Sequence, residues 1–325
     1  MIEIRLVGDT EVGTGLAVVR GRSFGGVKPR HLLEMLALHL GTSVSKHRLA
    51  DLLWQGLPPA SWTATLESYV SVLRARLEPG VPARASVVRT VNGGYLLDSD
   101  RVRVDSATVR DLVAQAGSTR AAVALPLLRQ SLQLAAGDLL ASSVGLPWAD
   151  EARQEHLRLR VHAAVMAAQH ALHLGQAQTA LTFADTALAL DPMAEQACRL
   201  AMRALWASGR TAEAVRRHAE LRAVLADELG VDPAPQTQQV LLQLLRDERS
   251  VDVPIQRRST DHPLLIAGRP ERTYDRLTRD LVVALRRAAA ATDGDEDPEL
   301  VAKLRDVLRH LQRGAAPDRS ATVAS

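Results

Sequence analysis

A strand-like pattern of apolar and polar residues opens the chain. Ile2, Ile4 and Leu6 alternate with polar residues, and a second short apolar run follows at residues 16–19 after glycine-rich turns. Alternation with a period of two is typical of a strand that buries one face. Residues 1–25 are therefore predicted to form short strands.

Three helices are predicted between residues 28 and 77. Apolar residues recur at helical spacing from Leu32 to Leu40, and Gly41 is the expected C-cap. Ser45 is expected to cap a second helix over residues 46–54. A third helix should begin near Pro59, because the fixed φ of proline suits a first helical turn. Its apolar stripe consists of Trp62, Leu66, Tyr69, Val70, Leu73 and Leu77.

A hairpin is predicted after the third helix. The apolar runs at residues 87–91 and 95–97 are separated by Asn92-Gly93-Gly94, and an Asn-Gly pair between strands favours a type I′ turn. Strands, three helices and a terminal hairpin predict a winged helix-turn-helix domain over residues 1–104. In such a domain the third helix enters the major groove, and the hairpin wing lies along phosphates or an adjacent minor groove.

The chain becomes helical and alanine-rich from Asp105 onward. The segments at residues 175–180 and 209–214 match each other at a spacing of 34 residues, which is the tetratricopeptide period. A helical-repeat domain is predicted over residues 105–248. The remainder is predicted to be a linker at 249–263, a helical extension at 264–313 and a disordered tail at 314–325. The predicted fold class is mainly α with a small β component.

Charge and composition narrow the class of protein. Residues 1–104 contain 13 Lys/Arg and 9 Asp/Glu, so the positive excess lies in the predicted winged helix. The chain has three lysines, and none stands in the Gly-Lys-Ser/Thr context of a nucleotide-binding P-loop. One cysteine excludes an intrachain disulfide, and no apolar run is long enough to span a membrane. We therefore expect a cytoplasmic protein without a membrane partner.

The third predicted helix presents a face of small residues. Helical steps of 100° place Ala64, Ser68, Ser71 and Ala75 opposite Leu66. These side chains can approach thymine methyls or donate single hydrogen bonds to bases, but they cannot form a bidentate Arg–guanine contact. The candidate base-contacting residues are Ala64, Thr65, Ser68, Ser71 and Val72. The alternative is that this face is only a solvated surface.

Arginines flank this face. Arg74 and Arg76 lie at opposite edges of the helix and Arg89 lies on the wing strand, where phosphate contact would fix the register of the protein on DNA. Arg74 has an alternative role, because an arginine near the core edge can pair with an internal carboxylate such as Glu34. Thr90 is a further wing candidate.

No catalytic or metal-binding arrangement is found in the sequence. The histidines of the repeat domain do not match a His-Glu-x-x-His zinc motif, and Cys198 lies within a helical run, as expected for a core residue. The acidic cluster at residues 293–299 is explained by a solvated loop before a helix start. We expect neither an enzyme nor a bound cofactor.

Two stretches resemble a known family. Residues 32–80, followed by "VVRTVNGGYLLD", look like the OmpR-type DNA-binding half of the SARP/AfsR regulators, the Streptomyces antibiotic regulatory proteins. Downstream, "LPWADEARQEHLRLR" and residues 175–235 are similar to the bacterial transcriptional activation domain of that family. The resemblance implies an activator of secondary-metabolite genes that binds promoter direct repeats on double-stranded DNA. It further implies recruitment of RNA polymerase holoenzyme and dimer contacts through the helical domain.

The resemblance also bears on individual residues. Trp54 resembles the loop tryptophan of the family and is a candidate for phosphate contact, with core packing as the alternative. Val72 stands where the family often has arginine, which suggests a base preference that is either weaker or dependent on apolar contact. Asn92, at the wing tip, also replaces a frequent arginine, so turn formation is its alternative role. Tyr95 is a candidate wing contact.

The sequence supports three hypotheses for the function. The first is an activator, and the second is a repressor or modulator that uses the same DNA-binding domain to occlude a promoter. The third is a ligand-sensing or scaffold protein whose helical repeat carries the main activity. Salt-sensitive, sequence-selective DNA binding distinguishes the first two from the third.

Overall fold

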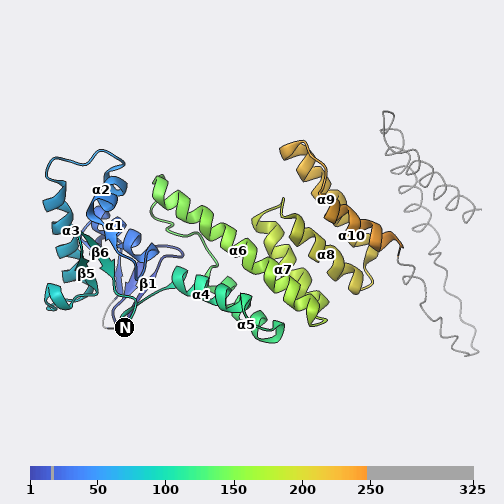
Figure 1. Cartoon of the computed structure of the whole chain (residues 1–325), viewed down its shortest axis with the longest axis horizontal. Coiled ribbons are helices and arrows are strands. Elements are labelled where there is room, and N and C mark those ends of the chain that lie inside the picture. The colour runs from blue at the N-terminus through green and yellow to red at the C-terminus, as the bar shows by residue number, and fades with distance from the viewer. Residues whose placement is uncertain (16–17, 247–325) are drawn as a thin grey trace, which may run out of the picture. The chain divides into compact units, whose positions relative to one another are not determined.

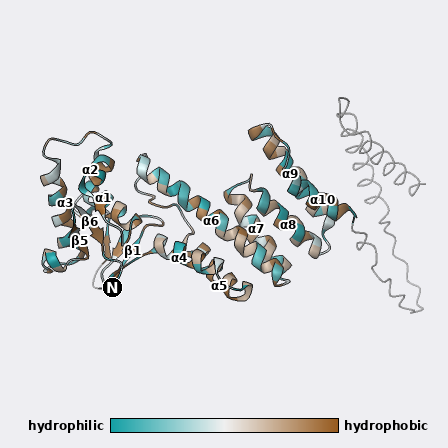
Figure 2. Cartoon of the chain, viewed as in Figure 1, coloured by the Kyte–Doolittle hydropathy of each residue, from teal (hydrophilic) through white to brown (hydrophobic). Residues whose placement is uncertain are grey.

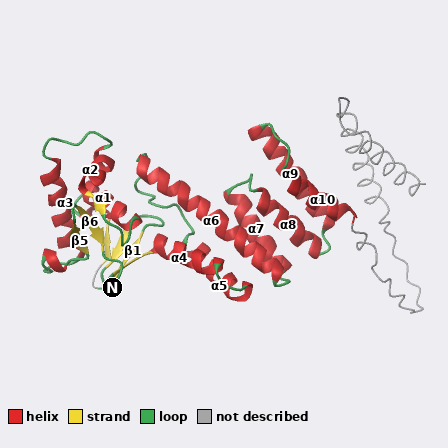
Figure 3. Cartoon of the chain, in the orientation of Figure 1, coloured by secondary structure: helices red, strands yellow, loops and turns green. Residues whose placement is uncertain are grey.

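The computed structural model describes residues 1–15 and 18–246, which belong to one compact unit that spans residues 1–253. The predicted linker at 249–263, helical extension at 264–313 and tail at 314–325 lie outside the described residues. Helices predominate in the described part, and strands are concentrated in its N-terminal portion (Figures 1 and 3). The predicted fold class, mainly α with a small β component, is confirmed.

A four-stranded sheet opens the domain. Its strands are β1 (Ile2–Arg5), β2 (Glu11–Gly13), β3 (Val18–Arg20) and β7 (Val102–Val104), in the order β3-β2-β1-β7. β1 pairs antiparallel with β2 and parallel with β7. Ile2 and Ile4 are buried and the residues between them are exposed, which confirms the predicted alternation. A 3₁₀ turn, η1 (Gly21–Phe24), leads from this sheet to the helices.

Three helices and a second sheet follow. They are α1 (Val27–Leu38), α2 (Lys46–Trp54) and α3 (Trp62–Leu77), with the strands β4 (Val44–Ser45), β5 (Val88–Val91) and β6 (Gly94–Leu97) in the order β4-β6-β5; the short turn η2 (Ala83–Ala85) precedes β5. The Ser45 hydroxyl accepts a hydrogen bond from the backbone N–H of Arg48 at 3.1 Å, which confirms the predicted cap of α2. This arrangement is a winged helix-turn-helix.

Two helix boundaries differ from the prediction. α1 ends at Leu38 with His39 as its C-cap, so Gly41, at φ +75°, lies in the following turn and is not the cap. α3 begins at Trp62 and not near Pro59, because the Pro59 carbonyl instead accepts the Trp62 N–H at 2.9 Å and closes a turn before the helix. Propensity locates helices better than it locates their ends.

The hairpin turn also differs in type. Val91 pairs with Gly94, which leaves Asn92 and Gly93 as a two-residue turn. A type I′ turn requires a positive φ at both positions. Gly93 has φ +77°, but among the described residues only Gln55 and Leu140 are non-glycines with positive φ, so Asn92 does not adopt that conformation. The predicted hairpin is therefore present with a different turn.

Seven helices make up the rest of the described chain. They are α4 (Asp105–Gly117), α5 (Ala121–Leu134), α6 (Pro147–His173), α7 (Ala177–Leu190), α8 (Glu195–Ala207), α9 (Thr211–Leu229) and α10 (Pro235–Arg246). Gly175 and Gly209 have φ near +70° at the turns before α7 and α9, where only glycine adopts this conformation without strain. Ala180 and Ala214, the matching small residues, are fully buried. The predicted 34-residue repeat thus corresponds to equivalent helix pairs.

Apolar residues gather into two cores. The first fills the winged helix between its sheets and helices, where hydrophobic residues are concentrated (Figure 2). Leu139, Leu140, Trp148 and Ala149 also belong to this core, although they follow α5 in the sequence. The second core lies among α4–α10 and is rich in alanine. The segment before α6 therefore packs on the winged helix, beyond the sequence boundary predicted at residue 104.

Polar contacts reinforce this junction. The Asp105 carboxylate accepts the backbone N–H groups of Leu6 and Val7 at 2.9 Å. Glu34, fully buried on α1, accepts hydrogen bonds from the Thr10 hydroxyl at 2.6 Å and the Ser143 hydroxyl at 2.8 Å. Burial raises the pKa of the Glu34 carboxyl. The bonds of Asp105 and Ser143 join segments more than 90 residues apart in the chain and fix the start of the repeat domain against the winged helix.

Candidate nucleic-acid interface

The exposed face of α3 is the centre of the candidate interface. Leu66, Val70, Leu73 and Leu77 are at most 2% exposed and pack α3 into the first core. The opposite face is exposed and consists mainly of Ala64, Ser68, Ser71 and Ala75. Its side chains are short, so the helix backbone can approach the floor of a major groove closely.

Two candidate residues at the edges of this face contact the protein itself. The Thr65 hydroxyl donates a hydrogen bond to the Ser61 carbonyl at 3.1 Å. Val72 is half-buried and lies directly against Gly25 at the end of η1, where an added Cβ would overlap Val72 Cγ1. Val72 therefore fixes η1 against α3 and presents only part of its side chain to solvent.

Arg74 joins α3 to the wing. Its guanidinium donates to the Val88 carbonyl at 2.9 Å and 2.7 Å, and to the Thr90 hydroxyl at 2.9 Å. The alternative prediction, a pairing of Arg74 with Glu34, is wrong, because the cation near Glu34 is Arg30 at 3.3 Å. Because Arg74 lies on α3 and Val88 begins the wing strand β5, these hydrogen bonds fix the position of the wing relative to the helix.

Arg76 and Arg89 are more accessible. Arg76 is exposed in the last turn of α3, and no hydrogen bond or ion pair of its side chain is found within the described part of the chain. Arg89 on β5 is 56% exposed, and its guanidinium lies 3.8 Å from the Asp98 carboxylate. Exposed arginines beside a recognition helix are suited to phosphate contact.

The remaining candidates on and near the wing differ in exposure. Asn92 is exposed at the tip of the hairpin, whereas Tyr95 is 2% exposed and packs in the first core. The predicted contact of Tyr95 with DNA is therefore disfavoured by its burial. Trp54 is half-buried, and its ring stacks on Tyr69 with ring centres 6.3 Å apart. This contact agrees with the alternative prediction that Trp54 packs against the core.

An ion pair that the sequence analysis missed lies beside this face. Lys46, at the start of α2, donates to the carboxylate of Glu67 at 2.6 Å, and its ammonium lies 5.7 Å from the centre of the Tyr95 ring. The hydrogen bond to Glu67 raises the pKa of Lys46. Glu67 is the one acidic residue of α3. The positive charge of Lys46 offsets the repulsion that the Glu67 carboxylate would exert on DNA phosphates. The partners are 21 residues apart, so no local pattern predicts the pair.

No helix among residues 1–15 and 18–246 is long and apolar enough to span a membrane. Burial raises the pKa of the Cys198 thiol to about 11, and Cys198 is 1% exposed, which confirms its predicted place in the core.

The fold and this face define a winged-helix DNA-binding protein with an attached helical-repeat domain. Two family models match the chain: "Transcriptional regulatory protein, C terminal" at residues 26–97 and "Bacterial transcriptional activator domain" at residues 97–245. The chain belongs to the SARP family of transcriptional regulators, which are not enzymes.

Named relatives agree with this assignment. The chain is 34% identical over 239 residues to the regulatory protein DnrI of Streptomyces peucetius, which covers 69% of this chain and 86% of that protein. It is 33% identical over 236 residues to the regulatory protein AfsR of Streptomyces griseus; that match covers 71% of this chain but only 24% of AfsR. The chain therefore spans about a quarter of the AfsR relative.

A solved structure has the same fold. Mycobacterium tuberculosis EmbR, determined in complex with a low affinity phosphopeptide, matches with a TM-score of 0.65 at 24% sequence identity. The match covers 75% of this chain and 65% of EmbR. At this identity the likeness supports the architecture alone.

Proposed function

We propose that this protein activates transcription of secondary-metabolite genes by binding direct repeats in promoters and recruiting RNA polymerase holoenzyme. The observation that carries the proposal is the exposed face of short side chains on α3, flanked by the half-exposed Arg89 and by Arg76, for which no ion pair is found within the described part of the chain. The association with secondary metabolism rests on the family resemblance.

The geometry supports separate roles on DNA for the short side chains of α3 and for the arginines beside them. Ser68 and Ser71 donate or accept hydrogen bonds at base edges, while Ala64 and Ala75 contact thymine methyls in the major groove. Arg76 and Arg89 contact phosphates on either side and supply the salt-dependent part of the affinity. Arg74 holds the wing at the angle that this contact requires.

Direct repeats would place two copies of the chain on the DNA in the same orientation. Half-sites separated by one helical turn, about 34–36 Å, place both recognition helices on the same side of the duplex. The helical-repeat domains of a homodimer would then lie on that side as well. This leaves the opposite side of the promoter open to polymerase.

A repressor that uses the same face remains the second candidate. DNase footprinting followed by transcription in vitro with purified RNA polymerase holoenzyme separates the two. The template is the DNA upstream of the gene for this protein and its neighbours. We expect protected direct repeats and more transcript; protected repeats with less transcript identify a repressor, and absence of a footprint contradicts DNA recognition by α3.

A further inference from the structure

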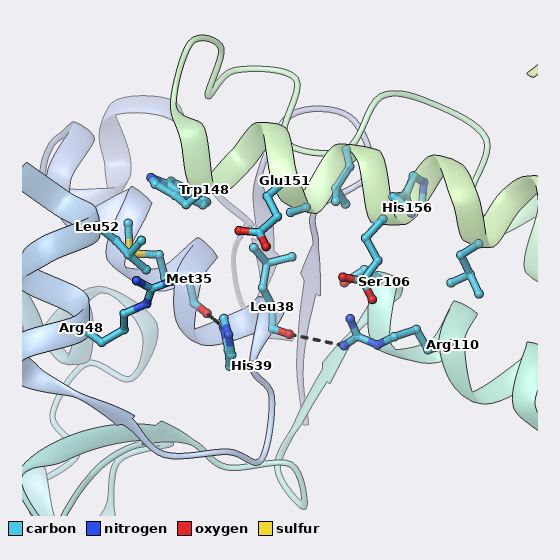
Figure 4. A pocket seen from close by; sticks show the side chains of 14 residues that line it. Met35, Leu38, His39, Arg48, Leu52, Ser106, Arg110, Trp148, Glu151 and His156 are labelled. Carbon is cyan, nitrogen blue, oxygen red and sulfur yellow. Dashed lines mark hydrogen bonds between the residues drawn. The ribbon is translucent and has the colours of Figure 1, made fainter. Parts of the chain in front are cut away.

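A cavity of about 240 Å³ lies between the winged helix and the beginning of the repeat domain (Figure 4). It is larger than cavities of about 150 Å³ that hold a benzene ring. Apolar side chains from α1, α2, α6 and the segment before α6 line much of it: Met35, Leu38, Leu52, Leu139, Trp148, Ala152 and Leu159. The cavity therefore has room for the apolar body of a small molecule.

Two carboxylates line the same cavity. Glu151 and Glu155 are one turn apart on α6, and both are exposed. Figure 4 shows Glu151 pointing from α6 toward Leu38. No hydrogen bond or ion pair of either carboxylate is found within the described residues. Like charges at this spacing on a helix destabilise each other, so a cation between them would be bound favourably.

The cations at the cavity already have partners. Arg48 lies 3.6 Å from the Asp51 carboxylate, and Arg110 donates to the Leu38 carbonyl at 3.4 Å. The Asp150 carboxylate in the first turn of α6 pairs with Arg153 at 2.6 Å. No ion pair is found for the two cavity carboxylates within the described residues, and Arg110 likewise has no carboxylate partner there.

A buried hydroxyl adds a third acceptor. Ser106, near the start of α4, lines the cavity and is 5% exposed, and its Oγ has no hydrogen-bond partner within the described part of the chain. A buried hydroxyl without a partner is destabilising. Its oxygen can accept a hydrogen bond from an ammonium group, and so can both carboxylates. Among the described residues, the unpartnered polar groups of this lining are the two carboxylates and Ser106 Oγ, which can accept from an ammonium, and Trp148 Nε1, which donates.

We propose that this cavity is an effector site for a small apolar amine. The ammonium group lies between Glu151 and Glu155 within reach of Ser106, and the apolar body packs on Leu38 and Trp148. Such a ligand contacts α1 and α2 of the winged helix together with α4 and α6 of the repeat domain. Its binding stabilises the arrangement in which these helices enclose the cavity.

Isothermal titration of the full chain with tryptamine tests the proposal. Tryptophol, which replaces the amine with a hydroxyl, and indole-3-propionate, which replaces it with a carboxylate, are the matched ligands. We expect tryptamine to bind at least about fivefold more tightly than either, as expected for about 1 kcal/mol from one ion pair. Equal binding of the three compounds, tighter binding of the acid, or no binding of tryptamine would overturn the proposal.

Variants locate the site. Glu151→Gln and Glu155→Gln should each weaken tryptamine about fivefold, whereas Glu228→Gln, an equal charge change on the exposed end of α9, should leave binding unchanged. Ala152→Phe fills the cavity from α6 and should abolish binding. Unchanged affinity in both glutamine variants, or in a folded Ala152→Phe protein, would contradict the assignment; the glutamine variants decide the matter if Ala152→Phe does not fold.

Discussion

Replacement of Arg74 with methionine separates a structural role from a DNA-contact role. Methionine keeps an unbranched apolar stem but removes the guanidinium that donates to the Val88 carbonyl and the Thr90 hydroxyl. A hydrogen bond from a charged donor contributes about 1.5–3 kcal/mol, and Arg74 is half-buried, so we expect a loss of about 2 kcal/mol. In a protein of this size that corresponds to a fall of about 5 °C in Tm.

Arg76→Met is the matched control. Arg76 lies on the same helix two residues further on, is exposed and makes no side-chain contact of this kind among the described residues. Its replacement should leave Tm within about 1 °C of the wild type, since substitutions on an exposed surface change stability by at most about 0.5 kcal/mol.

DNA binding measured over a range of salt concentrations completes the test. If Arg76 contacts a phosphate, Arg76→Met lowers the slope of log affinity against log salt by about 0.9. Arg74→Met should weaken binding at every salt concentration with the slope unchanged, because the wing loses its position and no phosphate contact is removed. An unchanged Tm in Arg74→Met, or a reduced slope in that variant alone, would refute the assignment of Arg74 as a positioning residue.

Three further predictions concern charge, pH and packing. Glu67→Gln should raise affinity for non-specific DNA about twofold to fivefold at low salt, because it removes a repulsion of phosphate; an effect that persists at high salt would contradict this cause. Burial, with Arg30 and Lys28 nearby, lowers the pKa of His31 from 6.5 to about 4, so the free energy of unfolding should fall, by at most about 3 kcal/mol, as pH drops from 6.5 toward 4. Urea denaturation across this range should show that loss in wild type and not in His31→Asn, and a parallel loss in both would exclude His31 as its source. Gly25→Ala should destabilise the fold by about 1–3 kcal/mol, because a Cβ at φ +85° would overlap Val72; a stability within 0.5 kcal/mol of wild type would contradict this contact.

The sequence predicted what local patterns encode. The buried stripe of α3 and the Ser45 cap of α2 were recognisable because their signals lie within one or two helical turns. The repeat spacing predicted the turns at Gly175 and Gly209 for the same reason. These local features predict a winged helix followed by helical repeats, which is the fold class that the structure shows.

The sequence could not predict contacts between distant segments. The approach of Val72 to Gly25 and the pairing of Lys46 with Glu67 depend on how separate elements pack. The burial of Tyr95 likewise arises because β6 lies between β4 and β5. A candidate that looks exposed in the sequence pattern is therefore buried in the folded domain.

The position of the segment before α6 also depends on contacts between segments that are distant in the sequence. Residues 139–149 follow two helices of the repeat domain, yet several of their apolar side chains complete the core of the winged helix. The same segment also donates the Ser143 hydrogen bond to Glu34, which spans 109 positions in the chain. The cavity between the two domains exists because of this packing, and no motif marks it.

If the exposed face of α3 recognises DNA sequence, its serines should be needed for specific binding. Hydroxyl-radical footprinting compares the wild type with a Ser68→Ala, Ser71→Ala double variant on the upstream DNA, with non-specific competitor present. We expect the wild type to protect direct repeats. The variant should lose about 1–3 kcal/mol in specific affinity, with non-specific binding unchanged. Equal footprints for the two proteins would show that α3 does not recognise the sequence through these serines.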